Sequence, residues 1–512
     1  MKTSYLFKAV EEFDNETYTY NGDKAFKTTL NKCLDLFYSG ASYRDESDSV
    51  KFCNLVTEAF LENPLAAIRV LFYLRDIRGN SGQGERDVFR SGMEIIAKLK
   101  PEIFINSEII SLIPYYGRWD DIFVLFDIDK KIDEVIFNLI NKTLSEDITY
   151  WRNGESVSLL AKWLPSINTS SQKSRLLAKK ICRALGLSEK IYRQTLSKLR
   201  SHINILEKKL SNNQFDFDYS GLPSRAKMIH SGVGNVFMRK DEKRYMEHVE
   251  ALAACIKSGS TEVKTNTQGL YPHEIIKKTL DGRTDNTTQS LLDSTWRSLP
   301  NYFSEESKNR NWLAVVDTSG SMTMGSGQAL NVSFAMGLYI AERNNGIFKN
   351  QMITFSSHPT FIQVDDEWSI EEKANYLYRN QINDNTNLRA VFELVLGAAK
   401  KHNLPASEMP EAIVIISDMQ FDSYSMGGDV GESTFESIKK KYKSHGYEMP
   451  KLIFWNASEY NTGNVPVTVN EQGVILAGGC KPGMFEMILG SKSPDEFMFS
   501  IINSERYSII SF

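Results

Sequence analysis

Short, almost wholly apolar runs in the C-terminal part of the chain restrict its fold more than any other feature. The runs are WLAVV from Trp312, AIVIIS from Ala412, KLIFW from Lys451 and GVILAGG from Gly473. Strands of this length without polar alternation are typical of a parallel sheet buried on both faces. Residues 311–512 are therefore predicted to form a doubly wound α/β domain, with its site at the carboxyl ends of the strands.

Between these strands the sequence predicts helices and one pair of adjacent strands. The expected helices span residues 329–343, 370–379, 388–402 and 435–444. The segments QMITFSS and PTFIQV are interpreted as a β-hairpin or neighbouring strands.

The preceding part of the chain has a helical pattern. From residue 50 to 260, apolar residues recur three and four positions apart with almost no strict alternation, most clearly in a helix predicted over Glu189–Leu210. Residues 50–260 are therefore predicted to form an α-helical, HEAT-like solenoid or ring of packed helix pairs, although no strict sequence period is visible. Residues 1–49 are interpreted as an N-terminal arm and the polar, turn-rich residues 261–310 as a linker.

Cysteine usage and hydropathy bear on the cellular compartment. The five cysteines are widely spaced and form no C-x-x-C pattern, which disfavours a disulfide framework or a structural zinc site. The N-terminus lacks the apolar run of a signal peptide, and no stretch approaches 18 apolar residues. We expect a cytoplasmic protein without a membrane contact.

Charge is distributed unevenly along the 512 residues. The net charge is −4, yet residues 151–250 contain 19 Lys and Arg against 9 Asp and Glu, and residues 311–512 contain 15 against 23. A basic block of this kind attracts nucleic-acid phosphates, but it can equally be the solvated face of amphipathic helices. The candidate RNA-binding residues are Arg175, Lys179, Lys180, Arg183, Arg193, Lys198, Arg200, His202, Arg239, Lys240, Lys243 and Arg244.

Three polar segments follow the predicted strands or precede a helix of the α/β domain. They are Asp317-Thr318-Ser319-Gly320-Ser321, Asn385-Thr386-Asn387 and Ser417-Asp418. Hard divalent cations prefer oxygen ligands, so a Mg²⁺ or Mn²⁺ site is predicted, with an open coordination position that could recruit an acidic side chain of a protein partner. The alternative is that the aspartates cap helices and turns at the sheet rim. The candidate ligands are Asp317, Ser319, Ser321, Thr386 and Asp418.

This arrangement resembles the metal-ion-dependent adhesion site of von Willebrand factor A domains. Asp317, Ser319 and Ser321 match the family's D-x-S-x-S motif, and Thr386 and Asp418 match its separated threonine and aspartate. The resemblance covers residues 311–512 and implies a divalent cation at this position.

Residues 50–250 contain five further segments that carry a second resemblance. They are Arg75-Asp76-Ile77-Arg78-Gly79, Gly84-Glu85-Arg86, Tyr116-Gly117-Arg118-Trp119-Asp120-Asp121, Ala161-Lys162-Trp163-Leu164-Pro165-Ser166 and Pro223-Ser224-Arg225-Ala226. These segments resemble parts of the Ro (TROVE-domain) ribonucleoproteins and, more closely, of their uncharacterised plant, viral and phage relatives. The resemblance implies helical repeats that close into a ring and bind small structured RNA outside and single-stranded RNA in the hole.

The arginines and tryptophans of these segments admit two interpretations. Arg75, Arg78, Arg86 and Arg118 can contact RNA or form ion pairs with Asp76, Glu85, Asp87 and Asp120. Trp119 and Trp163 can stack on bases or belong to the core.

The sequence favours a binding protein over an enzyme. The segment from Gly79 to Gly84 lacks the G-x-x-x-x-G-K-[S/T] pattern, and neither H-E-x-x-H nor G-x-S-x-G occurs. We therefore expect an RNA-binding, Ro-like protein without enzymatic activity. A metal-dependent protein-interaction module is the alternative, and a metal-assisted nuclease is a third, weaker hypothesis.

Overall fold

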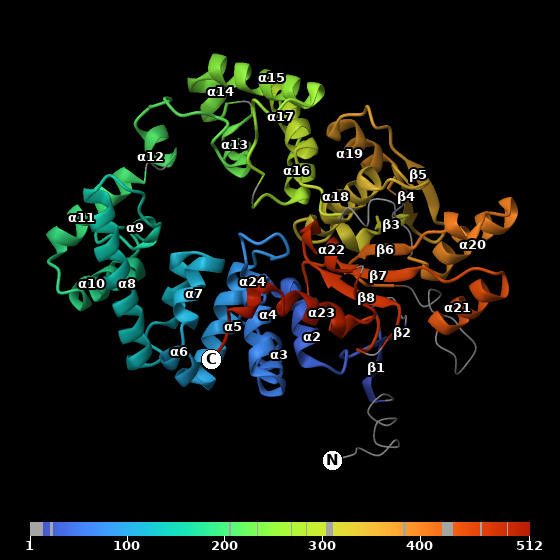
Figure 1. The fold of residues 1–512 in the computed structure, drawn as a ribbon, viewed down its shortest axis with the longest axis horizontal. Coiled ribbons are helices and arrows are strands. Elements are labelled where there is room, and N and C mark those ends of the chain that lie inside the picture. Colours follow the sequence, from blue (N-terminus) through green and yellow to red (C-terminus); the bar gives the residue numbers. More distant parts are fainter. Residues whose placement is uncertain are drawn as a thin grey trace.

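A computed structural model gives the fold of the chain. It describes residues 14–20, 24–203, 206–232, 234–267, 269–282, 284–303, 311–381, 386–421, 434–460, 463–469, 471–488 and 490–512. Within these residues, helices dominate the first three hundred positions and a six-stranded sheet follows (Figure 1).

The sheet has the strand order β5-β4-β3-β6-β7-β8, with β5 antiparallel to β4 and all other neighbours parallel. The predicted α/β domain is therefore present, and the predicted hairpin is its antiparallel edge. The strand order runs outward from β3 through β4 to β5 and, in the opposite sense, from β6 through β7 to β8, so β3 and β6 flank the switch point at which open α/β sheets bind ligands. The strands are β3 (Trp312–Asp317), β4 (Gln351–Phe355), β5 (Thr360–Gln363), β6 (Ala412–Ser417), β7 (Lys451–Asn456) and β8 (Val474–Gly478).

Alternate residues of each strand enter two different cores. Leu313 and Val315 face a core that includes side chains of α20 and α21, whereas Ala314 and Val316 join a core that extends into the helical part of the chain. The second core holds buried residues from Cys33 to Ile510, so the two parts of the molecule share one apolar interior. The helices of this domain are α18 (Gln328–Arg343), α19 (Ile370–Arg379), α20 (Leu388–His402), α21 (Thr434–Ser444), α22 (Phe485–Ile488), α23 (Pro494–Ile502) and α24 (Glu505–Ser508).

The helices before the sheet form an arc that starts beside β8 and returns to the α/β domain at α18 and α19 (Figure 1). The α/β domain occupies the space between the two ends of the arc. A HEAT-like repeat stays a prediction. The helices are α2 (Lys32–Ser39), α3 (Val50–Glu62), α4 (Pro64–Arg75), α5 (Arg86–Leu99), α6 (Pro101–Asn106), α7 (Ile109–Tyr116), α8 (Lys130–Arg152), α9 (Leu160–Trp163), α10 (Gln172–Ala184), α11 (Glu189–His202), α12 (Leu206–Ser211), α13 (Ser224–His230), α14 (Val236–Lys240), α15 (Glu242–Ser258), α16 (Pro272–Thr279) and α17 (Asn286–Arg297).

Several element boundaries differ from the sequence expectation. The helix predicted over Glu189–Leu210 is divided, because α11 ends at His202 and α12 begins at Leu206. The segment 261–310, interpreted as a linker, contains α16 and α17, which pack against α18 and α19. Polarity concealed α17, because it buries one face while the other carries Thr and Gln side chains. No helix in the described part of the chain combines the length and hydropathy needed to cross a bilayer.

The N-terminal segment joins the α/β domain. The strands β1 (Glu16–Tyr18) and β2 (Lys24–Phe26) pair with each other, and Phe26 exchanges backbone hydrogen bonds with Val465. Helix α2 is buried against β8, α3 and α4. Residues expected to form a peripheral arm therefore contribute to the shared core.

Asp76 forms the first polar seam between the two parts of the molecule. Its buried carboxylate accepts hydrogen bonds from the backbone N–H of Arg78 and Gly79 at 2.9 and 2.8 Å. It also accepts hydrogen bonds from the guanidinium of Arg506 and from the hydroxyl of Tyr507. This carboxylate thus fastens the turn after α4 to the C-terminal helix α24.

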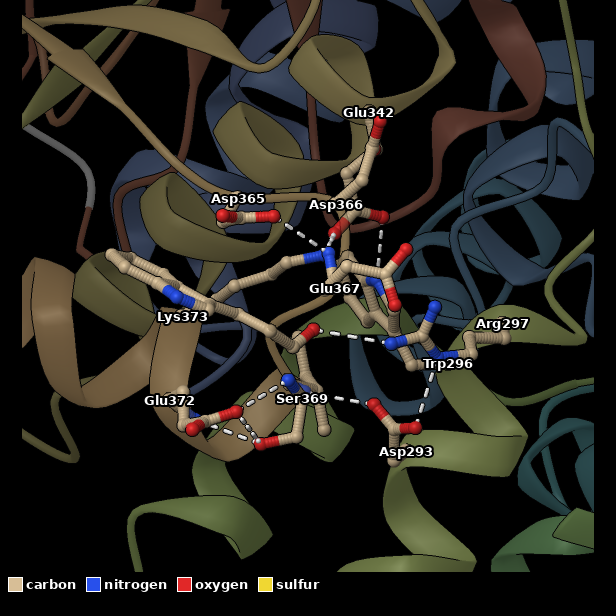
Figure 2. Close-up of polar contacts among 12 residues, drawn as sticks. Asp293, Trp296, Arg297, Glu342, Asp365, Asp366, Glu367, Ser369, Glu372 and Lys373 are labelled. Carbon is tan, nitrogen blue, oxygen red and sulfur yellow. Dashed lines mark hydrogen bonds and ion pairs between the residues drawn. The ribbon is translucent and has the colours of Figure 1, made fainter. Parts of the chain in front are cut away.

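A second seam joins the far end of the arc to the same domain, as Figure 2 shows. The indole of Trp296 in α17 donates to Glu342 of α18 at 2.7 Å, and the ammonium of Lys373 in α19 donates to the other oxygen of that carboxylate at 3.0 Å. Asp293 accepts from the backbone N–H of Ile370 at 2.9 Å. Both ends of the arc are therefore hydrogen-bonded to the α/β domain.

Loss of the first seam should destabilise the whole chain. In Asp76→Asn the guanidinium of Arg506 loses its charged partner in a buried setting, and the free energy of unfolding should fall by about 3–5 kcal/mol. The measurement is urea unfolding of full-length variants. Asp87→Asn is the control, because Asp87 pairs with its neighbour Arg86 at the surface and should change stability by less than about 1 kcal/mol. Equal stabilities of the two variants would contradict the assignment.

Lys227 in α13 should make stability depend on alkaline pH. Its side chain is fully buried, its amine has no hydrogen-bond partner among the described residues, and burial lowers its pKa to about 8. Below pH 8 the folded state holds an unpaired charge, and this penalty disappears as the pH rises towards the ordinary lysine pKa. Lys227→Met should therefore raise the free energy of unfolding by on the order of 2 kcal/mol at pH 7 and give no advantage above pH 10.

The control for Lys227→Met is Lys257→Met, which removes an exposed ammonium from α15. Urea unfolding of both variants at pH 7 and pH 10 separates a local effect from a general charge effect. A gain in Lys227→Met that is the same at both pH values would contradict the assignment.

Candidate nucleic-acid interface and cation site

The five residues predicted as metal ligands lie together at the carboxyl ends of β3 and β6. Asp317 is the last residue of β3, and its carboxylate accepts from the backbone N–H of Ser319 at 2.9 Å and from the hydroxyl of Ser417. The hydroxyls of Ser319 and Ser321 are 3.0 Å apart. Parallel pairing of β3 with β6 brings Asp418, the residue after β6, to the same edge.

Burial and like charge dominate the electrostatics at this edge. Burial, and then the negative charge of Asp418, raise the pKa of Asp317 to about 7, and burial also raises the pKa of Asp418. No lysine or arginine forms an ion pair with either carboxylate in the described structure. Two buried acids without a counterion, surrounded by hydroxyls, form an oxygen donor set that fits a hard divalent cation.

Thr386 belongs to the same cluster through the segment after β6. It is buried, and its hydroxyl donates to the backbone carbonyl of Gln420 at 3.2 Å. The backbone N–H of Gln420 in turn donates to Asp418 at 3.2 Å. Neither aspartate is an N-cap of an adjacent α-helix, because α18 and α20 have Gly327 and Asn387 at that position.

A cavity with a volume of about 1220 Å³ lies between the arc and the α/β domain. The helical part lines most of it, and Gln328 and Cys480 come from the α/β domain. The lining includes six arginines, which are Arg44, Arg75, Arg78, Arg86, Arg118 and Arg225. It also includes the acids Glu85, Asp87 and Glu274 and the aromatic residues Tyr115, Trp119 and Tyr271.

Four of the five segments that carry the resemblance to Ro-like proteins contribute residues to this cavity, whereas residues 161–166 do not line it. The R-D-I-R-G, G-E-R, G-R-W and P-S-R segments each contribute an arginine to its lining, although they are spread from residue 75 to 226. Gly84 has a φ of +77°, and the hydroxyl of Tyr271 occupies the place where its Cβ would lie. That hydroxyl donates to the carbonyl of Gln83 at 2.9 Å, which closes one wall of the cavity.

Both interpretations of the arginines apply, to different residues. Arg75 is buried and pairs with Asp121 at 2.8 Å rather than with Asp76, whose partner is Arg506. Arg44 pairs with Glu85, Arg86 with Asp87, and Arg225 with Glu274. Carboxylates hold these arginines in place. Arg75, which is also buried, therefore has a structural role.

Arg78 and Arg118 differ from the other arginines of the cavity. Neither forms an ion pair with a described carboxylate side chain, and Arg118 lies over the ring of Trp163 at 4.8 Å. Burial and then the charge of Arg75 lower the pKa of Arg118, against the smaller opposing effect of the carboxylates of Asp120 and Asp121. Trp119 is half-buried, packs against the shared core and also lines the cavity.

The twelve predicted RNA-binding residues fall into two groups. Lys180, Arg200 and Arg244 contact other parts of the chain, as when Lys180 pairs with Asp127 at 2.6 Å and Asp133 at 2.7 Å. Weaker contacts hold Lys179 to Glu189, Lys243 to Glu247, Lys198 to Trp151 and His202 to the carbonyl of Glu155. The exposed remainder, without an ion pair to a described side chain, is Arg175, Arg183, Arg193, Arg239 and Lys240.

Sequence reasoning missed the cavity residues that come from distant segments. Arg44, Tyr271, Gln328 and Cys480 carry no local motif, and only the fold brings them together. The side-chain amide of Gln328 joins two of them, because its oxygen accepts from Arg44 at 2.7 Å and its nitrogen is 3.4 Å from the sulfur of Cys480.

Two family descriptions match the chain. Residues 19–112 and 186–308 match the domain of unknown function DUF2828, and residues 311–506 match the domain of unknown function DUF7788. The two matches meet between residues 308 and 311. Because neither description is a von Willebrand factor A domain, that assignment stays a resemblance.

A viral relative covers nearly the whole chain. The uncharacterized protein L728 of Acanthamoeba polyphaga mimivirus is 30% identical over an alignment of 505 residues, which covers 93% of this chain and 85% of the mimivirus protein. The chain belongs to the L728 family. The expected similarity to uncharacterised viral relatives is thereby confirmed at the level of the family.

The chain also aligns with a solved structure. The crystal structure of the Deinococcus radiodurans Ro (RSR) protein covers 92% of this chain and 93% of its own, with a TM-score of 0.33 and 10% sequence identity. A similarity at this level does not establish a common fold.

Proposed function

We propose that this protein binds RNA, with single-stranded segments in the central cavity and folded segments on the basic surface of α10 and α11. The observation that carries the proposal is the cavity of about 1220 Å³, in which Arg78 and Arg118 lack carboxylate partners among the described residues. Cations that the fold does not neutralise are available to phosphates, whereas paired arginines serve the fold.

The cavity chemistry suits unpaired nucleotides. Tyr115, Trp119 and Tyr271 offer rings on which bases can stack, and the arginines offer donors to the backbone phosphates. The volume is close to the upper range of small-molecule sites, which suits a few nucleotides of one strand. The outer surface contributes Arg175 and Arg183 on α10, both exposed, which would contact phosphates of a structured RNA.

The proposal includes a divalent cation, Mg²⁺ or Mn²⁺, at the edge of the sheet. Asp317 and Asp418 would supply negative charge, and Ser319, Ser321 and Thr386 would supply neutral oxygens. The buried, uncompensated pair of carboxylates supports this assignment. The bound cation would supply charge neutralisation and an open coordination position.

The loop after Ser321 leads from this edge to the cavity wall. Ser326 donates to Glu459 through its backbone N–H at 3.1 Å and its hydroxyl at 2.7 Å, and α18 then begins at Gln328, which contacts Arg44. Neutralising the two aspartates would therefore stabilise a loop that ends at the proposed RNA site.

The alternative is a metal-dependent protein-interaction module, in which an acidic side chain of a partner protein completes the coordination. The same donor set supports it, because hydroxyl ligands leave the cation incompletely neutralised. In both versions the protein acts by binding and not by catalysis. Binding to RNA with and without the divalent cation, compared with cation-dependent capture of an acidic protein, distinguishes the two versions.

Reversing a cavity charge should weaken binding to single-stranded RNA. Arg78→Glu places a carboxylate where the proposal places a phosphate, so affinity should fall by about tenfold or more. The slope of log affinity against log salt should also become shallower by about one unit. Fluorescence anisotropy with an unstructured oligoribonucleotide across a salt series measures both quantities.

Lys142→Glu is the matched control for Arg78→Glu. Lys142 is an exposed lysine of α8 that does not line the cavity, so the same charge reversal there should change affinity by less than about twofold. Equal losses in the two variants would mean that net charge, not the cavity, governs the interaction. Wild-type affinity in Arg78→Glu would contradict the proposal that RNA binds in the cavity.

Removing the charge of Asp317 should abolish the response to divalent cations. Mg²⁺ should raise the thermal midpoint of the wild type and leave Asp317→Asn unchanged, because binding to the folded state alone stabilises it. Without added cation, Asp317→Asn should be at least as stable as the wild type, since it removes a buried negative charge. Differential scanning fluorimetry with a Mg²⁺ titration measures both effects.

Asp365→Asn is the control for the cation experiment. Asp365 is exposed and follows the antiparallel strand β5, so it lies towards the opposite edge of the sheet. Its variant should keep the full Mg²⁺ response. A Mg²⁺ response in Asp317→Asn equal to that of the wild type would contradict the assignment of a cation site to the carboxyl ends of β3 and β6.

A further inference from the structure

A second pocket lies in the helical part of the chain, separate from the central cavity. It has a volume of about 330 Å³, within the range of small-molecule sites. Its walls come from α11, from the segment after α9 and from Lys208 of α12. None of its lining residues also lines the central cavity. They are Ser166, Ile167, Asn168, Tyr192, Arg193, Leu196, Ser197, Arg200 and Lys208.

The pocket is strongly cationic. Its lining contains three basic residues, Arg193, Arg200 and Lys208, and no carboxylate. Elsewhere in the described structure, buried or half-buried arginines such as Arg75 and Arg506 are paired with aspartates. The lining of this pocket therefore carries an excess of positive charge, which an anionic ligand would neutralise.

Arg200 is fixed in place without a counterion. Its guanidinium donates to the carbonyls of Ala161 and Leu164 at 2.7 and 2.6 Å and to the hydroxyl of Ser166 at 2.7 Å. All three acceptors are neutral, so these bonds orient the guanidinium without cancelling its charge. Because guanidinium has five N–H donors, two remain for a ligand. A preorganised cation of this kind reduces the entropy lost when an anion binds.

The remaining walls are apolar and aromatic. Ile167, Tyr192 and Leu196 are buried, and the hydroxyl of Tyr192 donates to the carbonyl of Pro165 at 3.0 Å, which fixes the ring. Ser197 and Asn168 are exposed at the pocket and offer hydrogen-bonding groups. A ligand that satisfies both kinds of wall has an anionic group and a flat, partly apolar body with polar edges.

We propose that this pocket binds a single unpaired nucleotide, with its phosphate at Arg193, Arg200 and Lys208 and its base against the apolar wall that contains Ile167 and Leu196. Nucleotides combine the required anion and planar body, and aromatic and apolar walls accept base faces with little sequence preference. The nucleotide comes either from the solution as a free mononucleotide or from an RNA strand, and the second source alone rests on the proposed function.

The test compares a steric block with a matched control on the same helix. Ser197→Trp fills the pocket without changing charge, whereas Gln194→Trp adds the same ring to an exposed position outside it. Isothermal titration of the full chain with adenosine and uridine 5′-monophosphates should show binding to the wild type and to Gln194→Trp. Affinity should fall at least tenfold in Ser197→Trp, with circular dichroism confirming that each variant is folded.

A second pair of variants tests the charge. Arg193→Glu should weaken mononucleotide binding at least tenfold, while Lys190→Glu, an exposed lysine of α11 outside the pocket, should change it by less than twofold. Inorganic phosphate and the nucleosides, each tested alone, should bind at least tenfold more weakly than the nucleotide. Phosphate that binds as tightly as the nucleotide, or mononucleotide affinity that is unchanged in Ser197→Trp, would overturn the proposal.

Titration with single-stranded RNA identifies the source of the nucleotide and tests the proposed function separately. Weaker RNA binding by Ser197→Trp identifies a nucleotide of the strand as the occupant, and unchanged RNA binding together with lost mononucleotide binding identifies a free nucleotide. Both results support the pocket. Failure of RNA binding in the wild type, with mononucleotide binding intact, would reject the proposed function and leave this inference standing.

Discussion

The buried dipeptide Arg75-Asp76 is the point on which the closed arrangement of this protein depends. The two charged side chains leave the end of α4 towards different partners, Arg75 to Asp121 within the helical arc and Asp76 to Arg506 of the C-terminal helix. Each charge is almost completely removed from water, and each is matched by a partner and by further hydrogen bonds. Because an unpaired buried charge is far more costly than a paired one, the paired geometry is strongly preferred over alternatives in which the arc and the C-terminus separate.

Closure of the arc explains why the α/β domain has an unusual central helix. In an open doubly wound fold, a helix on the sheet keeps one face in solvent, yet α18 is buried without interruption from Val332 to Ala341. Its second face packs against α16, so the helical part covers what would otherwise be surface. One core therefore includes both parts of the molecule, and the wall of the central cavity is built by both.

The sequence predicted those features that depend on neighbouring residues. The strands were recognisable because burial on both faces removes every polar position, and α19 and α20 agree with the predicted ranges 370–379 and 388–402. The proximity of Asp317 and Asp418 followed from strand ends that must meet at one edge. The cavity was beyond such reasoning, because Arg44, Gln328 and Cys480 share no local pattern and meet only after the arc has closed. For the same reason Lys180 was predicted to face RNA, although Asp127 and Asp133 hold it.

The number of arginines does not distinguish structural from ligand-binding arginines in this chain, but the presence or absence of a carboxylate partner does. Arg75, Arg86, Arg118 and Arg200 look alike in sequence, since each stands beside polar or aromatic neighbours in a helical segment. In the fold, Arg75 and Arg86 are matched by carboxylates, whereas Arg118 lies over an indole and Arg200 contacts neutral oxygens. Desolvation of such a cation is not compensated by a counterion. The same holds for Lys227, which is buried without a hydrogen-bond partner among the described residues but lines neither pocket. Arg118 and Arg200 differ from it because each lines a pocket, where an anion from outside the chain can complete the electrostatics.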